Sequence, residues 1–292
     1  MRFWKAFALL LLFITGSTSI YISLHASANT KSSKTKMKEK SLPFFYLVIP
    51  SYNNELWAKK NLESIICQTY TNWHACYIND ASQDATGQVV ESFIKEHHLE
   101  NKFTVIHNQT RLGALANTYH AIHLADPRSI VVMIDGDDQL INDGALELVA
   151  KTYTKHPDTW LTYGSYASHP HMKRCICKEF SNSVKKNHTF RKVRYLSSHL
   201  RTFYAGLFQH INKEDLQRNG EFLPSAGDVA YMLPMLEMAA HNHYRFISEV
   251  LYLYRVDNPL NDFRNRPLQA ECSKYVRSLQ PYKPLNKATW LE

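Results

Sequence analysis

The chain has 292 residues, of which 45% are hydrophobic and 21% charged, a composition typical of a folded globular protein. A chain of this length can bury a sizeable core, in one large domain or two small ones, without depending on disulfides. The formal net charge of +8 suits an anionic ligand or surface, but the sequence contains no nucleic-acid-binding motif, so we do not expect nucleic acid as a partner.

The first 28 residues, 1–28, have the features of a secretory signal peptide or an uncleaved membrane anchor. A basic start precedes an apolar run at 6–14, and Ala26 and Ala28 have the spacing of a signal-peptidase site. Residues 29–42 are polar and rich in lysine, as expected of a linker. We therefore expect a protein of the secretory pathway, either exported or membrane-associated. Positive charge on both sides of the apolar run leaves its orientation open.

From residue 43 onward, apolar runs typical of strands alternate with segments in which apolar residues have helical spacing. The predicted strands are 44–50, 74–80, 103–108 and 129–135. The predicted helices are 55–68, 85–98 with Asp84 as its N-cap, 113–125, and 143–156 with Asn142 or Asp143 as its N-cap. Because the strands are almost continuously apolar, this alternation predicts an α/β fold whose parallel sheet is covered by helices on both faces.

Polar residues end all four predicted strands. In chain order they are Pro50, Ser51, Tyr52, Asn53, Asp80, Asn108 and Asp135. In an open α/β sheet, ligands bind just beyond the carboxyl ends of the strands, so these residues point to one crevice. A single Asp or Asn in such a place usually caps a helix or forms a turn, but four polar strand ends together favour a binding site.

The fourth strand ends in three acids, Asp135, Asp137 and Asp138, within the stretch VVMIDGDDQL. Three carboxylates this close repel one another unless a cation neutralises them. Asp135 and Asp137 offer the hard oxygen ligands that Mg²⁺ and Mn²⁺ prefer, and Arg111 is a further cationic contact for a phosphate group. The sequence has neither a glycine-rich dinucleotide motif nor a P-loop. An EF-hand loop is excluded because Leu146 stands where its twelfth-position Glu belongs.

Four motifs, VIPSYNNE, YINDASQDAT, HNQTRLGALAN and MIDGDDQL, occur in an order and spacing that resemble family 2 glycosyltransferases. The resemblance covers residues 44–160. It implies the GT-A fold, with a Rossmann-like, mostly parallel sheet. It also implies a nucleotide-sugar donor, by default a UDP-sugar, and a divalent metal, Mn²⁺ or Mg²⁺.

The resemblance also implies roles for individual residues. Those that line the nucleoside pocket would be Pro50, Ser51, Tyr52 and Asp80, the last bonding to the base. Asp135 and Asp137 would form the D-x-D element, with Asp137 as the direct metal ligand and Asp138 beside the sugar. The family's Arg after the third strand is missing, because Ala116 occupies its place, and Arg111 is the candidate replacement.

The second half, 161–292, also resembles the acceptor-binding region of this family, which leaves 43–160 as the half that binds the nucleotide sugar. Asp228 fits the family's catalytic carboxylate because it follows Ser-Ala-Gly and opens an apolar helix, although Gly227 stands where relatives often carry Glu. Its alternative role is that of an N-cap. The implied reaction is an inverting transfer in which Asp228 takes the proton from an acceptor hydroxyl on a glycan, lipid or protein.

Other side chains receive structural interpretations. Expected in the core are Cys67, Cys76, Trp57, Trp73 and Trp160. Four histidines without an evident partner are expected to be structural or exposed, His199, His210, His241 and His243. Cys175 and Cys177 lie near two histidines and leave a zinc site open, although their spacing is not a standard one. Arg255 is a candidate phosphate contact, Glu237 a polar residue inside a helix, and Tyr163, like Trp160, a candidate for stacking on an acceptor sugar.

Three other functions stay open from the residues alone. A non-catalytic nucleotide- or sugar-binding protein would keep the donor pocket and lack the base. A nucleotidyltransferase would need a glycine-rich loop with a basic residue near the first strand, which PSYNNE does not provide. A metal-dependent phosphohydrolase would release phosphate from simple esters without an acceptor.

Overall fold

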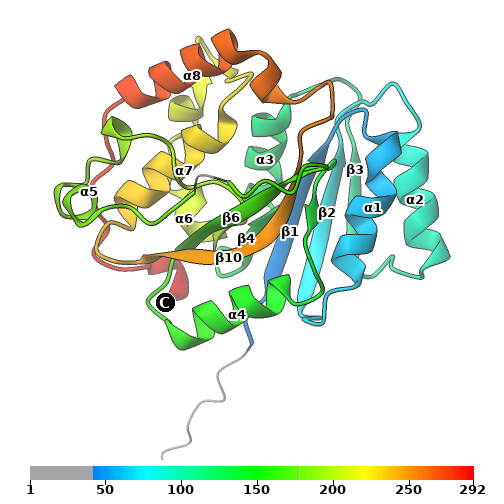
Figure 1. The fold of residues 1–292 in the computed structure, drawn as a ribbon, viewed down its shortest axis with the longest axis horizontal. Coiled ribbons are helices and arrows are strands. Elements are labelled where there is room, and N and C mark those ends of the chain that lie inside the picture. Colours follow the sequence, from blue (N-terminus) through cyan, green and yellow to red (C-terminus); the bar gives the residue numbers. More distant parts are fainter. Residues whose placement is uncertain (1–41, 176) are drawn as a thin grey trace, which may run out of the picture. The chain divides into compact units, whose positions relative to one another are not determined.

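A computed structural model describes residues 42–175 and 177–292 (Figure 1), so the predicted signal or anchor and nearly all of the predicted linker lie outside the described residues. The strands are β1 (Phe45–Ser51), β2 (Trp73–Asn79), β3 (Phe103–His107), β4 (Ile130–Met133), β5 (Gln139–Leu140), β6 (Leu161–His169), β7 (Arg201–Tyr204), β8 (Gln217–Arg218), β9 (Glu221–Phe222) and β10 (Tyr244–Arg255). The α-helices are α1 (Glu55–Ile66), α2 (Thr86–Glu96), α3 (Ala114–His123), α4 (Ala145–Lys155), α5 (Asn182–Asn187), α6 (Ala205–Gln209), α7 (Gly227–Met238) and α8 (Arg266–Ser278). None of these helices is both long enough and apolar enough to span a membrane.

Eight strands form one sheet in the order β3-β2-β1-β4-β7-β6-β10-β5. The pairs from β3 to β4 are parallel, which confirms the predicted sheet of the first half. β7 is antiparallel to both of its neighbours, and β6 and β10 are parallel to each other. The two predicted halves therefore share a single sheet, and residues 42–175 and 177–292 belong to one structural unit.

Alternate residues of the central strands face opposite sides of the sheet. In β1, Leu47 and Ile49 pack in one core with α1, α2 and α4, whereas Val48 packs in a second core with α3, α6 and α7. Because both faces of the sheet are covered, both sets of alternate residues in these strands are mostly apolar, which is why the strands are almost continuously apolar in the sequence.

The helices α2 and α4 begin later than predicted, and their predicted N-caps are wrong. Asp84 lies two residues before α2, where its carboxylate accepts the backbone N–H of Thr86 at 3.0 Å. Asn142 likewise accepts the backbone N–H of Gly144 at 3.1 Å, and α4 begins only at Ala145. These short polar side chains therefore stabilise the loops that lead into the helices.

A buried ion pair joins α7 to the segment before β7. Arg191 donates two hydrogen bonds to the carboxylate of Glu237, at 2.6 and 2.9 Å, and the side chains are only 7% and 2% exposed. Glu237 also accepts the backbone N–H of Tyr282 at 2.9 Å. The prediction that Glu237 is a polar residue inside a helix is thus confirmed, and its charge is offset by Arg191.

Replacing one partner of this pair leaves the other buried and uncompensated. We expect Arg191→Met to lower the free energy of unfolding by about 3–5 kcal/mol, since that is typical of a broken buried ion pair. Arg128→Met is the control, because Arg128 pairs with Asp126 on an exposed surface and should contribute less than about 1 kcal/mol. Urea unfolding of the full chain measures both, and equal effects would contradict the prediction.

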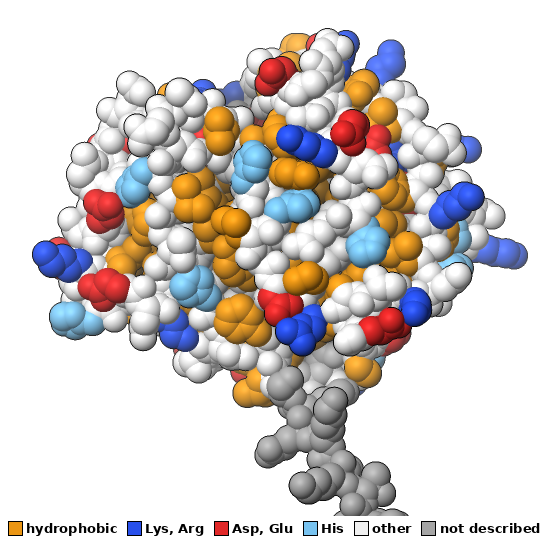
Figure 2. Space-filling view, turned by 180° about the vertical axis from the view of Figure 1, so that it is seen from behind, with side chains coloured by type: hydrophobic (Ala, Val, Ile, Leu, Met, Phe, Trp, Pro, Cys, Tyr) orange, Lys and Arg blue, Asp and Glu red, His pale blue; other side chains and the backbone are white. Residues whose placement is uncertain are grey.

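Figure 2 shows the face of the molecule that is hidden in Figure 1. Lys and Arg side chains lie singly on this face, several of them beside Asp or Glu, with hydrophobic and histidine side chains between them. The positive net charge of the chain is therefore not gathered into a basic patch on this face, and such a patch is what a nucleic-acid-binding surface requires.

Candidate functional site

A cavity of about 250 Å³ lies beyond the carboxyl ends of β1, β2 and β4. Its wall includes eight of the site residues predicted from the sequence, Pro50, Ser51, Tyr52, Asp80, Arg111, Asp135, Asp137 and Asp228. Asp138 and two of the predicted strand-end residues, Asn53 and Asn108, do not line it. The parallel topology brings together those that follow β1 to β4, because the carboxyl ends of the neighbouring strands meet at one edge of the sheet, whereas Asp228 comes from the start of α7.

Asp80 fixes the loop that follows β3. Its carboxylate accepts the backbone N–H groups of Leu112 and Gly113, each at 2.8 Å, and the side-chain amide of Asn108 at 2.8 Å. Burial alone would raise the pKa of Asp80, but these hydrogen bonds outweigh it and hold the pKa below its ordinary value. The loop that carries Arg111 is thereby held against β2.

Arg111 contacts Tyr52 directly. Its guanidinium lies 3.9 Å from the centre of the Tyr52 ring, a cation–π contact between the loop after β3 and the loop after β1. Both side chains line the cavity, so the wall on this side is an aromatic ring covered by a positive charge. Such a wall suits a flat base and an attached anionic group.

The Asp-Gly-Asp-Asp loop is packed tightly against the end of β1. The N–H of Gly136 donates to the carbonyl of Pro50 at 3.1 Å. A Cβ atom at position 136 would lie only 2.5 Å from the Cβ and Oγ of Ser51. Asn61 of α1 donates from its amide to the backbone carbonyls of Asp135 and Asp138, at 3.0 and 2.8 Å. The direction of the three carboxylates is therefore set by rigid backbone contacts.

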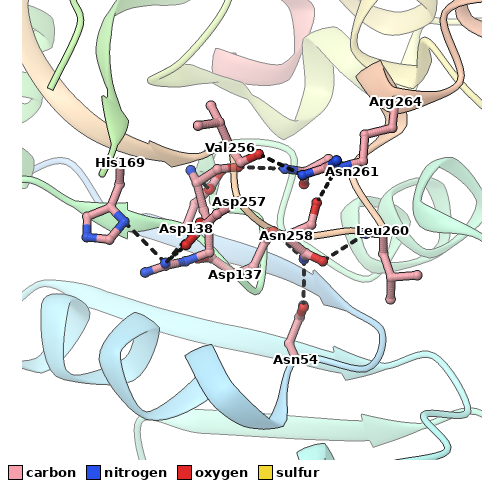
Figure 3. A network of polar contacts seen from close by, with 11 residues as sticks. Asn54, Asp137, Asp138, His169, Val256, Asp257, Asn258, Leu260, Asn261 and Arg264 are labelled. Atoms are coloured by element: carbon pink, nitrogen blue, oxygen red, sulfur yellow. Dashed lines mark hydrogen bonds and ion pairs between the residues drawn. The ribbon is translucent and has the colours of Figure 1, made fainter. Parts of the chain in front are cut away.

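Asp137 is held by the segment that follows β10. Asn258 donates from its side-chain amide to Oδ2 of Asp137 at 2.6 Å and also lies 3.4 Å from Oδ1 of Asn54 (Figure 3). Arg264 in turn donates to the carbonyl of Asn258 at 2.9 Å. Sequence reasoning missed Asn258, because an Asn in a loop carries no local pattern that distinguishes it.

Asp138 points away from the cavity, although it directly follows Asp137 in the chain. Its residue is 1% exposed, and Oδ1 accepts the backbone N–H of Arg255 at 2.7 Å. Oδ2 has no hydrogen-bond partner among the described residues. Burial raises the pKa of Asp138 well above its ordinary value, and repulsion from Asp137 and Asp135 adds to this. The structure thus does not bring Asp138 to the cavity wall.

Arg201 supplies the positive charge that the acidic cluster requires, and sequence reasoning missed it. Its Nη2 lies 3.6 Å from Oδ2 of Asp135, and its Nη1 donates to Oδ2 of Asp228 at 3.0 Å. Arg201 begins β7, which pairs with β4 so that Arg201 lies opposite Met133. A buried strand that carries an arginine needs an acidic partner, and this was the available signal.

Asp228 lies at the start of α7, as predicted. Its Oδ1 accepts the N–H of Val229 at 2.9 Å, and its Oδ2 accepts from Arg201. Both carboxylate oxygens are therefore positioned, while the side chain remains 29% exposed to the cavity. Asp262, from the segment after β10, lines the same part of the wall and accepts a hydrogen bond from Ser225 at 3.1 Å.

Opposing effects act on the pKa of Asp135. Loss of water around its carboxylate raises the pKa of Asp135 to about 6, the positive charge of Arg201 opposes this rise, and repulsion from Asp137 and Asp228 adds to it. A group balanced in this way is ready to accept a further cation.

The ligand atoms of Asp135, Asp138 and His199 lie within 4.8 Å of one another, the arrangement of a possible metal site. However, Arg201 donates to Nδ1 of His199 at 3.1 Å, so the proton of the neutral ring is on Nε2, the atom that faces Asp135 at 3.9 Å. Burial lowers the pKa of His199 well below its ordinary value, which keeps the ring neutral. The cavity-lining oxygens of Asp135 and Asp137 therefore fit Mg²⁺ or Mn²⁺ better than this histidine does.

Several other predictions are corrected by the structure. Trp160 and Tyr163 are 4% and 0% exposed, so neither can stack on an acceptor sugar. Cys67 is exposed rather than in the core, and Trp57 is only half-buried, whereas the remaining predicted core residues, Cys76 and Trp73, are buried.

Two further candidates from the sequence are the phosphate contact Arg255 and the zinc site left open at Cys175 and Cys177. Arg255 is buried and donates to the carbonyl of Asp137 at 3.1 Å, so its role is to support the acidic loop. Among the described residues, Cys175 and Cys177 do not form a group of three or more metal-ligating atoms with the nearby histidines.

The close approach at Gly136 gives a test of the loop geometry. Gly136→Ala should lower the free energy of unfolding by about 1–3 kcal/mol, because the new methyl group meets Ser51 and the loop must shift. Gly144→Ala is the matched control, since its nearest neighbour would be 3.7 Å away, and it should change stability by less than about 1 kcal/mol. Urea unfolding of both variants decides, and a harmless Gly136→Ala would show that this packing is not a constraint.

Comparison with known families now identifies the class of protein. A model of glycosyl transferase family 2 matches residues 46–213, more than half of the chain, and the chain belongs to this family. The putative glycosyltransferase EpsH of Bacillus subtilis is 31% identical over 127 residues, which cover 43% of this chain and 34% of EpsH. The chain thus spans about a third of the length of this relative.

Solved structures share the fold. TarS 1–349 of S. aureus in complex with UDP-GlcNAc has a TM-score of 0.53 and 17% identity, and the match covers 81% of this chain and 73% of that one. The mannosyltransferase PcManGT of Pyrobaculum calidifontis, in complex with GDP-Man and Mn²⁺, has a TM-score of 0.54 and 18% identity, with 83% and 66% covered. The GT-A fold implied by the sequence motifs is therefore confirmed.

Proposed function

We propose that this protein is a glycosyltransferase that moves a sugar from a nucleotide-sugar donor to an acceptor hydroxyl, with inversion at the anomeric carbon. One observation carries the proposal. The acids on the donor side, Asp135 and Asp137, and the candidate base, Asp228, line the same cavity. Membership of glycosyl transferase family 2 supports the same class of reaction.

A UDP-sugar is the donor that we propose. Proteins of similar fold hold UDP-GlcNAc and GDP-Man, which supports a nucleotide sugar in general. Tyr52, with Pro50 and Ser51 beside it, would form the nucleoside wall. Asp80 would accept an N–H of the base at its Oδ2, because this oxygen accepts one hydrogen bond among the described residues, from Gly113, and a carboxylate oxygen can accept two. Arg111 would contact the diphosphate.

Asp135 and Asp137 would hold Mn²⁺ or Mg²⁺, and the similar PcManGT structure contains Mn²⁺. A divalent ion bound there offsets the negative charge that builds on the departing nucleoside diphosphate. Asn258 and Gly136 would fix the two carboxylates before the donor arrives, so that little reorganisation is needed on binding.

Asp228 would remove the proton from the acceptor hydroxyl as that oxygen attacks the anomeric carbon. The N–H of Val229 and the guanidinium of Arg201 fix its carboxylate in advance. With one base and no nucleophile of the protein in the reaction, the displacement is direct and the configuration inverts.

The acceptor would be a hydroxyl group of a glycan, lipid or protein, and we propose an exported or membrane-associated location from residues 1–28. Fractionation of cells that express the chain with and without these residues tests the location. A full-length chain found entirely with the soluble cytoplasmic proteins would contradict it.

The donor site can be tested by thermal shift of the full chain. A ligand that binds only the native chain stabilises it, by about 2.7 kcal/mol at about 100 times its Kd. Since Mn²⁺ adds contacts to UDP, UDP with Mn²⁺ should raise the melting temperature more than UDP alone. Asp137→Asn should abolish the part of the shift that depends on Mn²⁺. Asp257→Asn, half-exposed on the neighbouring segment, is the control and should retain it. A metal-dependent shift that survives Asp137→Asn would refute this ligand assignment.

The base can be tested by turnover. The wild-type chain is first screened with Mn²⁺, a panel of nucleotide sugars and candidate acceptors, with release of nucleoside diphosphate as the readout. Asp228→Asn should then slow transfer by a factor of about 10²–10⁴, because it removes a general base, while UDP with saturating Mn²⁺ still raises the melting temperature. Unchanged turnover in this variant would exclude Asp228 as the base. Absence of turnover with every donor would favour a non-catalytic binding protein.

A further inference from the structure

Arg201 is shared between two carboxylates that have different proposed roles. Its Nη2 faces Oδ2 of Asp135 at 3.6 Å, and its Nη1 bonds to Oδ2 of Asp228 at 3.0 Å. The Arg201 side chain is only 4% exposed, so it cannot turn out into solvent. The register of β7 against β4 places the backbone of Arg201 opposite Met133, two residues before Asp135 in the chain.

We propose that Arg201 couples cation binding at Asp135 to its own hold on Asp228. This inference rests on the proposed function, since it takes Asp135 as a cation ligand and Asp228 as the base. A divalent ion at Asp135 and the guanidinium repel each other and compete for the same carboxylate. The ion therefore weakens the contact of Arg201 with Asp135 and leaves the guanidinium to Asp228.

The other contacts of Arg201 allow its guanidinium to shift its pairing from Asp135 to Asp228. Nη2 donates to the neutral ring of His199 at 3.1 Å, and the ring of Tyr231 lies 5.9 Å from the guanidinium carbon. Nε has no hydrogen-bond partner among the described residues. Asp135 and Asp228 are thus the two carboxylates that pair with it, and weakening one pair strengthens the other. Linkage makes this coupling reciprocal. The free energy by which cation binding strengthens the pairing of Arg201 with Asp228 equals the free energy by which that pairing strengthens cation binding.

A purely structural role for Arg201 predicts something different. A buried cation that only offsets two acids would, when removed, leave them unpaired and loosen the whole site, so cation binding would weaken. Coupling by competition predicts that removal of Arg201 strengthens cation binding. The two roles therefore differ in the sign of a measurable effect.

The experiment measures Mn²⁺ binding to the full chain in the presence of UDP, by calorimetry or by the electron paramagnetic resonance of free Mn²⁺. A pH of about 8 keeps Asp135 ionised. Asp228→Asn should weaken Mn²⁺ binding at least about fivefold, although Asp228 is not a proposed ligand, because Arg201 then pairs with Asp135 alone. Arg201→Met should tighten Mn²⁺ binding. In the Arg201→Met background, Asp228→Asn should change the Kd by less than about twofold.

Asp262→Asn is the matched control. It removes the same charge from the same cavity wall, but Asp262 bonds to Ser225 and not to Arg201. It should change the Kd for Mn²⁺ by less than about twofold. Equal weakening by Asp262→Asn and Asp228→Asn would overturn the coupling, since charge acting through space would then explain both. Persistence of the Asp228→Asn effect without Arg201 would overturn it as well.

Arg201→Lys guards against a variant that does not fold. Lysine keeps the positive charge, but its single nitrogen cannot bond to both carboxylates in the way that a forked guanidinium can. The Asp228→Asn effect should therefore also fall below about twofold in this background, and a full effect there would contradict the proposal. A wild-type chain that binds no Mn²⁺ would overturn the proposed cation site and the coupling together. Normal Mn²⁺ binding that is independent of Asp228 would overturn the coupling alone.

Discussion

The contact of Arg201 with Asp135 and Asp228 is the interaction on which the rest of the cavity depends. The two acids are far apart in the chain, one in the loop after β4 and the other at the start of α7. Placed on one cavity wall without a cation between them, they would repel each other in a poorly solvated space. Arg201 reaches both because β7 runs antiparallel between β4 and β6, which brings the beginning of that strand next to the end of β4.

Uncharged contacts then set the direction of each carboxylate. Gly136 lets the acidic loop lie against Ser51, and Asn61 holds the loop by two of its carbonyls. Asn258 comes from the segment after β10 and bonds to Asp137. The half of the chain that carries the motifs, 43–160, therefore depends on residues from the other half to complete its own acidic loop.

The sequence predicted the part of the structure that local patterns encode. The strands from β1 to β4 were found because buried parallel strands are continuously apolar, and the convergence of Asp80, Asp135 and Tyr52 followed from the rule for strand ends. Arg201 and Asn258 were missed because their roles depend on register and loop packing, which no local pattern shows. His199 is buried and bonds to Arg201, so its expected structural role is confirmed. Asp137 and Asp138 are adjacent in the sequence, yet only the first lines the cavity, because successive residues of a tight turn point in different directions.

The dense group of acids raised the question of what neutralises it, and the fold supplies most of the answer itself. Asp135 faces the guanidinium of Arg201, Asp137 accepts from the amide of Asn258, and Asp138 accepts from the backbone N–H of Arg255. Each acid thus has a partner within the protein, so the loop can keep its shape without a metal ion to hold it. A cation that binds Asp135 and Asp137 would therefore add charge to a preformed site instead of creating the site. Its binding free energy then remains available for holding a diphosphate, because little of it is spent on folding the loop.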